Sequence, residues 1–411
     1  MPQGTLYPRF IASKLYEALA DTPAVLIHGP RQCGKTTLAR QACSDYDYIT
    51  FDDQNMLAAV QHDPVGFAER LPRQVILDEV QRVPELFVCL KQCIDRDRKP
   101  GRFLLTGSAN VMLLPKLSDS LAGRIEILNL FPLAQCEIEE NRPTFLQNLL
   151  AGDVDAPKAG RLGDSLVSRI VRGGFPEPQK RTSEKRRRNW YSNYIDTLTL
   201  RDIRDVARIS QIDAIPKLLS LVAGQSAQLV NISGFATAFQ LSRPTIDGYV
   251  SLLRRIFLVE FLPPWFSNRS KRLVKTPKVH LTDTGLAAAL LKITEMQLQR
   301  NIASLGHLLE TFVYNELRKQ ASWHESELTL FHFRDKDQYE VDLIIEDEAG
   351  RLAGIEIKAA STVRGSDFKG LRRFKTITGT RFLTGVVLYD GDHVLPFGDQ
   401  FMAVPISALW T

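Results

Sequence analysis

The sequence predicts an α/β protein: a parallel sheet with helices on both faces, then a helical region, then a small C-terminal α/β domain. Strand and helix patterns alternate over residues 1–140, the pattern is helical over 141–203, and apolar β-like segments return near the C-terminus. A chain of 411 residues is also too long for one ordinary hydrophobic core, so two or three domains are expected.

Five apolar runs are the predicted strands of the N-terminal sheet. They lie near residues 24–28, 47–52, 74–78, 102–106 and 125–130. Ligands of open α/β sheets bind at the carboxyl ends of the strands, so the residues that follow these runs are the first candidates for a site.

The loop after the first strand carries a phosphate-binding pattern, G-x-x-x-x-G-K-T, followed by a further threonine. The residues are Gly29-Pro30-Arg31-Gln32-Cys33-Gly34-Lys35-Thr36-Thr37. Strand, glycine loop and helix follow one another as this Walker A motif requires. Backbone N–H groups and the helix N-terminus would surround a polyphosphate, Lys35 would reach its β- and γ-phosphates, and Thr36 would bind Mg²⁺. ATP and Mg²⁺ are therefore the predicted cofactors. Cys33 is interpreted as a small residue that fills the loop, although the helix N-terminus could lower its pKa.

The third strand ends in Asp78 and Glu79, which is a Walker B pattern. Asp78 would hold the Mg²⁺ coordination shell, usually through water. Glu79 would polarise the attacking water as general base, which indicates hydrolysis rather than nucleotide binding alone.

Small polar residues follow the fourth strand. Thr106 and Ser108 are candidates for sensing the γ-phosphate, with Asn110 a weaker one, and a strand that ends in a polar turn is the alternative. Arg124, after Gly123, is either a surface cap or an arginine finger that acts on the nucleotide of a neighbouring subunit.

Composition narrows the class of protein. Charged residues make up 24% of the chain and hydrophobic residues 44%, which is typical of a soluble globular protein. No apolar stretch approaches a membrane span, no secretory signal is visible, and the 5 cysteines include no C-x-x-C pair. We expect a cytoplasmic protein with no membrane partner. A net charge of +5 is compatible with a polyanionic partner.

The positive charges cluster in two places. Residues 180–188 are the densest basic run, either a solvated helix face or a contact for nucleic acid. Residues near 214–262 resemble a winged helix-turn-helix, with helices over 232–239 and 244–253 and a β-rich segment over 256–262. Residues 268–278, which follow, could form a basic wing. The alternative is a winged helix that serves only as a protein–protein spacer.

The C-terminal third holds a second group of charged residues. A helix over 305–317 offers Glu310, a strand over 339–345 offers Asp342, and a strand over 354–358 offers Glu356 and Lys358. Glu356 and Lys358 lie two residues apart and share one face of their strand. Asp342 and Glu356 are predicted to bind Mg²⁺, with Lys358 steadying the attacking water or the scissile phosphate. The alternatives are a non-cleaving copy of this fold and a chance salt bridge.

The order and spacing of these four residues resemble the PD-(D/E)XK nuclease superfamily. The chain as a whole resembles a prokaryotic AAA-type P-loop ATPase family in which a domain of unknown function follows the ATPase. The segments that carry this resemblance are residues 29–37, 77–81, 105–109, 173–177 and 281–286. It implies a P-loop AAA-type ATPase core over 1–140, a helical lid or connector over 141–213, a winged helix over 214–285 and a nuclease-like domain over 286–411.

Three functions compete at this point. The favoured one is a Mg²⁺-dependent ATPase that acts on DNA without strong sequence preference and works as a homo-oligomer such as a hexameric ring. The second is a nucleotide-controlled regulatory or assembly ATPase whose C-terminal domain binds a protein partner without cleaving DNA. The third is a metal-dependent nuclease gated by nucleotide.

Overall fold

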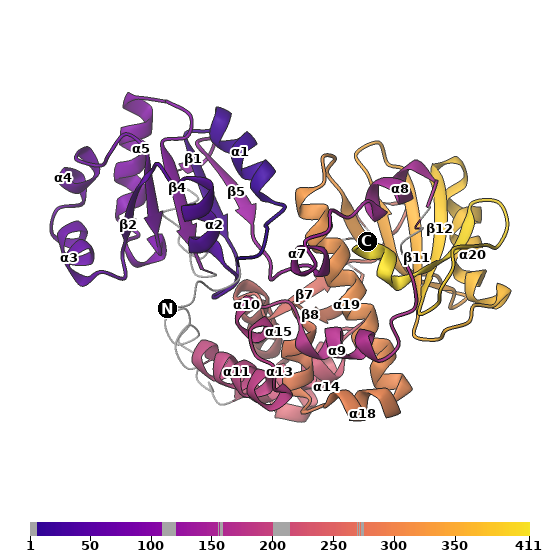
Figure 1. Ribbon diagram of the computed structural model, residues 1–411. Coiled ribbons are helices and arrows are strands. Elements are labelled where there is room, and N and C mark those ends of the chain that lie inside the picture. The colour runs from indigo at the N-terminus through magenta and orange to yellow at the C-terminus, as the bar shows by residue number, and fades with distance from the viewer. Residues whose placement is uncertain are drawn as a thin grey trace.

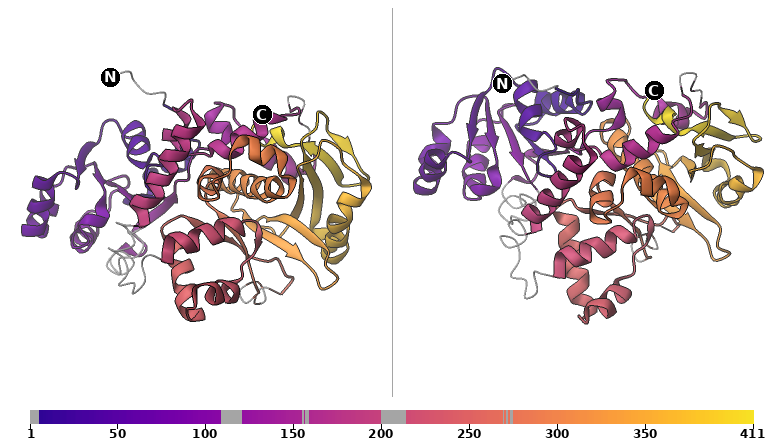
Figure 2. Two further views of the ribbon diagram at one scale, coloured as in Figure 1. Left: turned by 90° about the horizontal axis from the view of Figure 1, so that it is seen from below. Right: turned by 60° about the horizontal axis from the view of Figure 1, so that its bottom comes forward.

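The computed structural model describes residues 6–108, 121–154, 156, 159–199, 214–268, 270, 272 and 275–411. Its N-terminal α/β part and its C-terminal sheet lie at opposite ends, with the helical middle of the chain between and below them (Figure 1). The N-terminal part and the C-terminal sheet stay at opposite ends in the two further views (Figure 2). Among the described residues, no helix is long and apolar enough to cross a membrane.

The N-terminal part is a parallel sheet of strand order β2-β3-β4-β1-β5. The strands are β1 (Ala24–His28), β2 (Asp47–Thr50), β3 (Val75–Asp78), β4 (Phe103–Gly107) and β5 (Ile125–Asn129). The helices are α1 (Ala12–Asp21), α2 (Lys35–Ala42), α3 (Gln54–His62), α4 (Pro64–Glu69) and α5 (Leu86–Arg96), with the 3-10 turn η1 (Val80–Arg82). All five predicted strands are confirmed, each to within two residues at either end.

Alternate residues of β1 face opposite sides of this sheet. Val25 and Ile27 belong to a core with Leu15 of α1 and Leu38 of α2. Leu26 belongs to a second core with residues of α3 and α5. Both faces of the sheet are therefore covered by helices, which confirms the predicted fold class.

The middle of the chain is mainly helical. Its first helices are α7 (Gln135–Ile138), α8 (Phe145–Ala151), α9 (Asp164–Arg172), α10 (Pro176–Gln179) and α11 (Glu184–Thr197). The elements from residue 214 to 300 are α13 (Ala214–Gly224), β6 (Gln228–Leu229), α14 (Ile232–Phe239), α15 (Arg243–Arg255), β7 (Val259–Leu262), β8 (Lys278–Leu281), α17 (Thr284–Leu290) and α18 (Glu295–Arg300). The three strands form an antiparallel sheet of order β6-β8-β7.

One expectation for this region is corrected. The predicted β-rich segment 256–262 is a strand only from Val259, because Phe257 adopts a positive φ of 59° and turns the chain after α15. Helix α8 packs against the C-terminal sheet, since its apolar residues share a core with β11 and β12.

The C-terminal part is a mixed sheet of order β13-β14-β12-β11-β10-β9. Its strands are β9 (Thr329–Arg334), β10 (Glu340–Glu346), β11 (Leu352–Lys358), β12 (Phe382–Tyr389), β13 (Leu395–Pro396) and β14 (Phe401–Pro405). The accompanying helices are α19 (Ile302–Trp323) and α20 (Lys369–Thr378), with the 3-10 turns η4 (Gly365–Phe368), η5 (Gly379–Arg381) and η6 (Ile406–Leu409). Helix α19 covers one face of the sheet and α20 the other.

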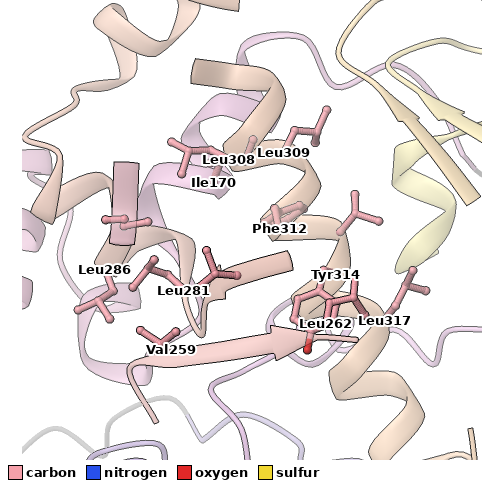
Figure 3. Close-up of a cluster of buried hydrophobic side chains, with 14 of the residues drawn as sticks. Ile170, Val259, Leu262, Leu281, Leu286, Leu308, Leu309, Phe312, Tyr314 and Leu317 are labelled. Carbon is pink, nitrogen blue, oxygen red and sulfur yellow. The ribbon is translucent and has the colours of Figure 1, made fainter. Parts of the chain in front are cut away.

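Helix α19 also joins this sheet to the middle of the chain. Leu308, Phe312 and Leu317 of α19 pack in one cluster with Leu281 of β8 and Ile170 of α9 (Figure 3). The core that contains them is continuous from the helical region into β11 and β12. The β6–β8 sheet is therefore held next to the C-terminal sheet by a shared core.

Candidate functional site

The loop between β1 and α2 has the backbone geometry of a phosphate cradle. Gly34, just before α2, adopts a left-handed φ of 104° that favours glycine. A Cβ at Gly29 would stand 2.1 Å from the backbone oxygen of Leu130, so only glycine allows this close approach. Cys33 is fully buried behind the loop, and burial raises the pKa of its thiol, so the interpretation as a filling residue fits the structure better than a lowered pKa.

Lys35 lies inside the loop. Its Nζ donates to the carbonyl oxygens of Gly29 at 3.2 Å and Pro30 at 2.8 Å, and the residue is 5% exposed. This places the ammonium group at the N-terminus of α2, where the helix dipole also favours an anion.

Asp78 is the centre of a hydrogen-bond network at the carboxyl end of β3. Thr36 Oγ1 donates to Asp78 Oδ1 at 2.8 Å, and the hydroxyl of Thr106 donates to the same oxygen. Tyr48 OH donates to Asp78 Oδ2 at 2.7 Å, and burial together with Asp78 raises the pKa of Tyr48 to about 12. The paired oxygens of Thr36 and Asp78 are the hard donors that Mg²⁺ prefers.

Glu79 is held by a neighbour that the sequence did not single out. Glu79 has a left-handed backbone, with φ 59° and ψ 43°, and its carboxylate accepts a hydrogen bond from the side chain of Gln81. The Gln81 oxygen in turn accepts from the backbone N–H of Ser108 at 3.4 Å. Gln81 therefore ties the candidate base to the end of β4.

The two predicted sensors differ in their environment. Thr106 is fully buried and already bonded to Asp78 and to the N–H of Glu79, so it supports the Walker B strand. Ser108 Oγ is buried and has no hydrogen-bond partner among the described residues, which leaves its hydroxyl available. Asn110 lies outside the described residues.

A cavity of about 610 Å³ opens beside this loop. Lys35, Thr36 and Glu79 line it together with residues from elsewhere in the chain, among them Arg9, Pro176, Glu177, Lys180 and Trp190. Helices α10 and α11 thus form one wall of the nucleotide-sized space. The sequence pattern gave no signal for Arg9, whose side chain donates to Cys33 O at 2.7 Å and to Phe131 O at 2.6 Å.

Arg124 lies at the opposite edge of the sheet. It precedes β5, and all strands are parallel, so it is at the amino edge while the phosphate loop is at the carboxyl edge. Its Nε donates to Asp95 Oδ1 at 2.6 Å and its second terminal nitrogen to Oδ2 at 3.1 Å. Arg124 cannot reach the phosphate loop of its own chain.

The structure brings together the four predicted residues of the C-terminal part and adds a fifth. Lys278 Nζ, from β8, donates to Glu310 Oε1 at 2.6 Å and lies 3.4 Å from Asp342 Oδ1. Lys358 Nζ donates to Glu356 Oε1 at 2.8 Å, and Glu356 Oε2 is buried with no partner among the described residues. We call Glu310, Asp342, Glu356, Lys358 and Lys278 the C-terminal charged cluster.

Charges in this cluster shift one another. Burial, reinforced by Asp342, raises the pKa of Glu310 to about 8, and the same two causes raise the pKa of Glu356. Burial by itself would lower the pKa of Lys278, but Glu310 and Asp342 outweigh it and raise that pKa.

The arrangement does not fit the predicted Mg²⁺ at Asp342 and Glu356. Within the described ranges, no group of three or more His, Cys, Asp or Glu residues is arranged to hold a metal ion. The carboxylates are instead paired with ammonium groups, Glu310 and Asp342 with Lys278 and Glu356 with Lys358.

Lys278 and Arg272 also correct the predicted basic wing over 268–278. Lys278 is 7% exposed, and its ammonium group contacts Glu310 and Asp342 of the cluster. Arg272 forms an ion pair with Glu346, whose side chain is 9% exposed. In the basic run 180–188, Arg187 is likewise buried and pairs with Glu295 at 3.0 Å. Both basic stretches therefore present fewer free charges than the sequence suggests.

Comparison with known proteins places this chain. It is 31% identical to the uncharacterized protein Rv2008c of Mycobacterium tuberculosis (strain ATCC 25618 / H37Rv) over 98% of this chain and 84% of that protein. The chain therefore belongs to the same protein family as Rv2008c. It is 24% identical to the uncharacterized protein MJ1544 of Methanocaldococcus jannaschii over 85% of this chain and 78% of that one. A Walker-type ATPase of Pyrococcus abyssi, PABY2304, is similar at a TM-score of 0.43 and 15% identity, covering 71% of this chain and 99% of that chain.

Three segments of the chain match family models. Residues 21–139 match an AAA domain, residues 163–297 a domain of unknown function (DUF8612), and residues 305–409 a domain of unknown function (DUF4143). The protein is a P-loop AAA-type ATPase, an ATP-hydrolysing enzyme, with a C-terminal domain of unknown function.

Proposed function

We propose that this AAA-type ATPase is Mg²⁺-dependent and acts on DNA, converting ATP hydrolysis into movement or remodelling of a largely nonspecific DNA substrate. The observation that carries the DNA role is the segment 214–281. In the part that the structure describes, its named elements run α13, β6, α14, α15, β7 and β8, with an antiparallel sheet of three strands and with Ser270 and Arg272 helical between β7 and β8. Helix, strand, two helices and two strands is the order we expect of a winged helix.

Helix α15 is the element we propose to face DNA. Ser242 caps it by accepting from the N–H of Thr245 at 3.2 Å, and its buried face, which includes Ile246 and Val250, packs into the core. The remaining face exposes Arg243 and Arg255. Such exposed cations at both ends of a helix suit phosphate contacts.

Gly248 is further evidence that another molecule contacts helix α15. It is exposed, and a Cβ there would meet nothing within 4 Å, so no packing against the described residues requires a glycine. Glycine in an exposed helix costs about 1 kcal/mol relative to alanine. Close approach of another molecule to the helix backbone would account for it.

The hydrolytic roles follow from the geometry of the phosphate loop. Lys35 would leave the carbonyls of Gly29 and Pro30 for the β- and γ-phosphates, and Thr36 and Asp78 would hold Mg²⁺. Bound Mg²⁺ would neutralise charge on the phosphate oxygens. Glu79, positioned by Gln81, would orient and deprotonate the attacking water, and Ser108 would contact the γ-phosphate.

We further propose a homo-oligomer, with a hexameric ring as the expected form. Arg124 is at the amino edge of the sheet, away from its own phosphate loop, so its proposed role as an arginine finger requires a neighbouring copy. The Asp95 partner would keep the guanidinium oriented until a neighbour docks.

For the C-terminal domain, we propose a nuclease-like fold that binds without cutting. The lysine-filled carboxylate cluster favours this over cleavage. The same observation keeps the second candidate open, in which the domain binds a protein partner and nucleotide controls assembly.

Measuring ATP hydrolysis with single-stranded, duplex and four-way-junction DNA tests the DNA role. We expect one form to stimulate turnover, and Arg243→Glu with Arg255→Glu to abolish the stimulation while basal turnover remains. Arg73→Glu, an exposed arginine before β3, makes the same charge change outside 214–281 and is the matched control. If no DNA form alters turnover and DNA affinity is insensitive to salt, the regulatory alternative takes its place.

A further inference from the structure

Lys278 belongs to the β6-β8-β7 sheet, and its side chain completes the C-terminal charged cluster. It is the first residue of β8, the central strand of the β6-β8-β7 sheet, and pairs in register with Leu229 on one side and Leu262 on the other. Its backbone is therefore fixed between two strands. Its side chain leaves that sheet and ends between Glu310 of α19 and Asp342 of β10.

The ammonium group of Lys278 lies between two acidic side chains, where a metal ion would otherwise be held. Lys278 Nζ is 2.6 Å from Glu310 Oε1 and 3.4 Å from Asp342 Oδ1, and the residue is 7% exposed. The other oxygen of Asp342 accepts from the backbone N–H of Ile357 at 2.9 Å. A divalent cation that bridged the two carboxylates would need the space that Nζ fills.

Charge balance in the cluster agrees with this placement. Three acidic side chains, Glu310, Asp342 and Glu356, lie beside two ammonium groups, those of Lys278 and Lys358. A divalent cation added to this set would bring two further positive charges beside two buried ammonium groups.

We propose that Lys278 is a built-in cation that occupies the divalent-metal position of the C-terminal cluster and keeps metal out while β8 is docked. The domain is then closed to metal-dependent cleavage by a residue of the β6–β8 sheet. This inference does not rest on the DNA role proposed above, because it concerns only which cation the carboxylates hold.

Binding of Mn²⁺ alone to the nucleotide-free full-length chain, followed by calorimetry, tests the proposal. We expect the wild-type chain to show no Mn²⁺ site that depends on Asp342. Lys278→Met, which removes the charge and keeps the length, should gain one Mn²⁺ per chain, at least tenfold tighter than any wild-type binding. Adding Asp342→Asn to Lys278→Met should abolish the gained site. The phosphate loop is the same in all these variants, so its own Mn²⁺ binding cancels in the comparison.

Melting temperature gives an independent readout. Lys278→Met leaves the two buried acidic side chains without the ion pair and hydrogen bond of the ammonium group, so it should melt below the wild type and regain the difference on addition of Mn²⁺. Lys278→Arg, which keeps the positive charge, should gain no site and no Mn²⁺-dependent stabilisation. A folded Lys278→Met chain with no Mn²⁺ gain would overturn the proposal.

If Lys278→Met fails to fold, the single variant Asp342→Asn in the otherwise wild-type chain still tests the proposal. The proposal requires that Asp342→Asn alone leave Mn²⁺ binding unchanged. Loss of a Mn²⁺ site on changing Asp342 in the wild-type chain would mean that metal enters beside Lys278, and the proposal would be wrong.

Discussion

Arg9 joins the N-terminal segment to the phosphate loop and to α7, and its removal should be costly. Its guanidinium donates to Cys33 O at 2.7 Å, to Phe131 O at 2.6 Å and to Glu137 Oε1 at 3.1 Å. The side chains of Arg9 and Glu137 are 7% and 0% exposed. Glu137 also accepts from the N–H groups of Phe10 and Ala134, each at 3.0 Å.

Breaking a buried ion pair by removing one partner costs about 3–5 kcal/mol, because the other charge stays buried. Glu137 would keep its two N–H donors, so for Arg9→Met we expect the lower end of that range, about 3 kcal/mol of unfolding free energy. The loop carbonyl of Cys33 would lose its anchor, and the Kd for ATP should rise about tenfold, which corresponds to about 1.4 kcal/mol.

Urea unfolding followed by tryptophan fluorescence measures the first effect and equilibrium titration with ATP the second. Arg73→Met, an exposed arginine, is the matched control and should change stability by less than about 0.5 kcal/mol. The double variant Arg9→Met with Glu137→Gln should lose less than the sum of the single variants, because the two side chains contact each other. An Arg9→Met chain as stable as the control would refute the argument.

Three further predictions concern the two charged sites. Gln81→Leu should lower kcat about tenfold with KM for ATP changed less than twofold, because Gln81 holds the Glu79 carboxylate and makes no predicted contact with the nucleotide; a change confined to KM would be inconsistent with that role. Mixing Arg124→Ala chains with Glu79→Gln chains should restore part of the ATPase activity that each lacks, whereas no restoration at any ratio would count against a finger in trans. Burial raises the pKa of Glu310 to about 8 from an ordinary value of 4.5, so between these pH values the folded chain binds more protons than the unfolded chain. The free energy of unfolding should therefore fall as pH rises through this window. The difference in unfolding free energy between pH 5.5 and pH 8, measured with urea, should be smaller for Glu310→Gln than for the wild type.

The sequence predicted the phosphate-loop side of the candidate site well because its signals are local. Gly29, Gly34 and Lys35 are constrained by a single turn between a strand and a helix, and Asp78 and Glu79 mark the end of a buried strand. Each of these features can be recognised within a few residues of chain.

Arg9 and Lys278 could not be predicted in the same way. Arg9 is 24 residues from the loop carbonyl that it binds, and no pattern marks it. Lys278 lies in a basic stretch that resembles a solvated wing, and only the packing of β8 against α19 turns it toward Glu310 and Asp342. Contacts between distant segments depend on tertiary packing, which a local charge pattern does not encode.

The limits at secondary-structure level have similar causes. The predicted strand over 256–262 failed at its start, because an apolar run gave no sign of the left-handed turn at Phe257. The helical pattern over 141–203 predicts helices there, but it does not predict that the apolar face of α8 packs on β11 and β12. Apolar patterning predicts that a face is buried but does not identify its partner.

ATP turnover by Glu79→Gln, measured beside its ATP affinity, tests whether the phosphate loop and the end of β3 form the catalytic site. We expect the variant to bind Mg²⁺·ATP as tightly as the wild type, within about twofold, and to hydrolyse it at least about a hundredfold more slowly. Lys35→Ala, run in the same assay, should lose binding itself. Near-normal turnover by Glu79→Gln, or tight ATP binding by Lys35→Ala, would contradict the assignment of this loop and strand as the catalytic site.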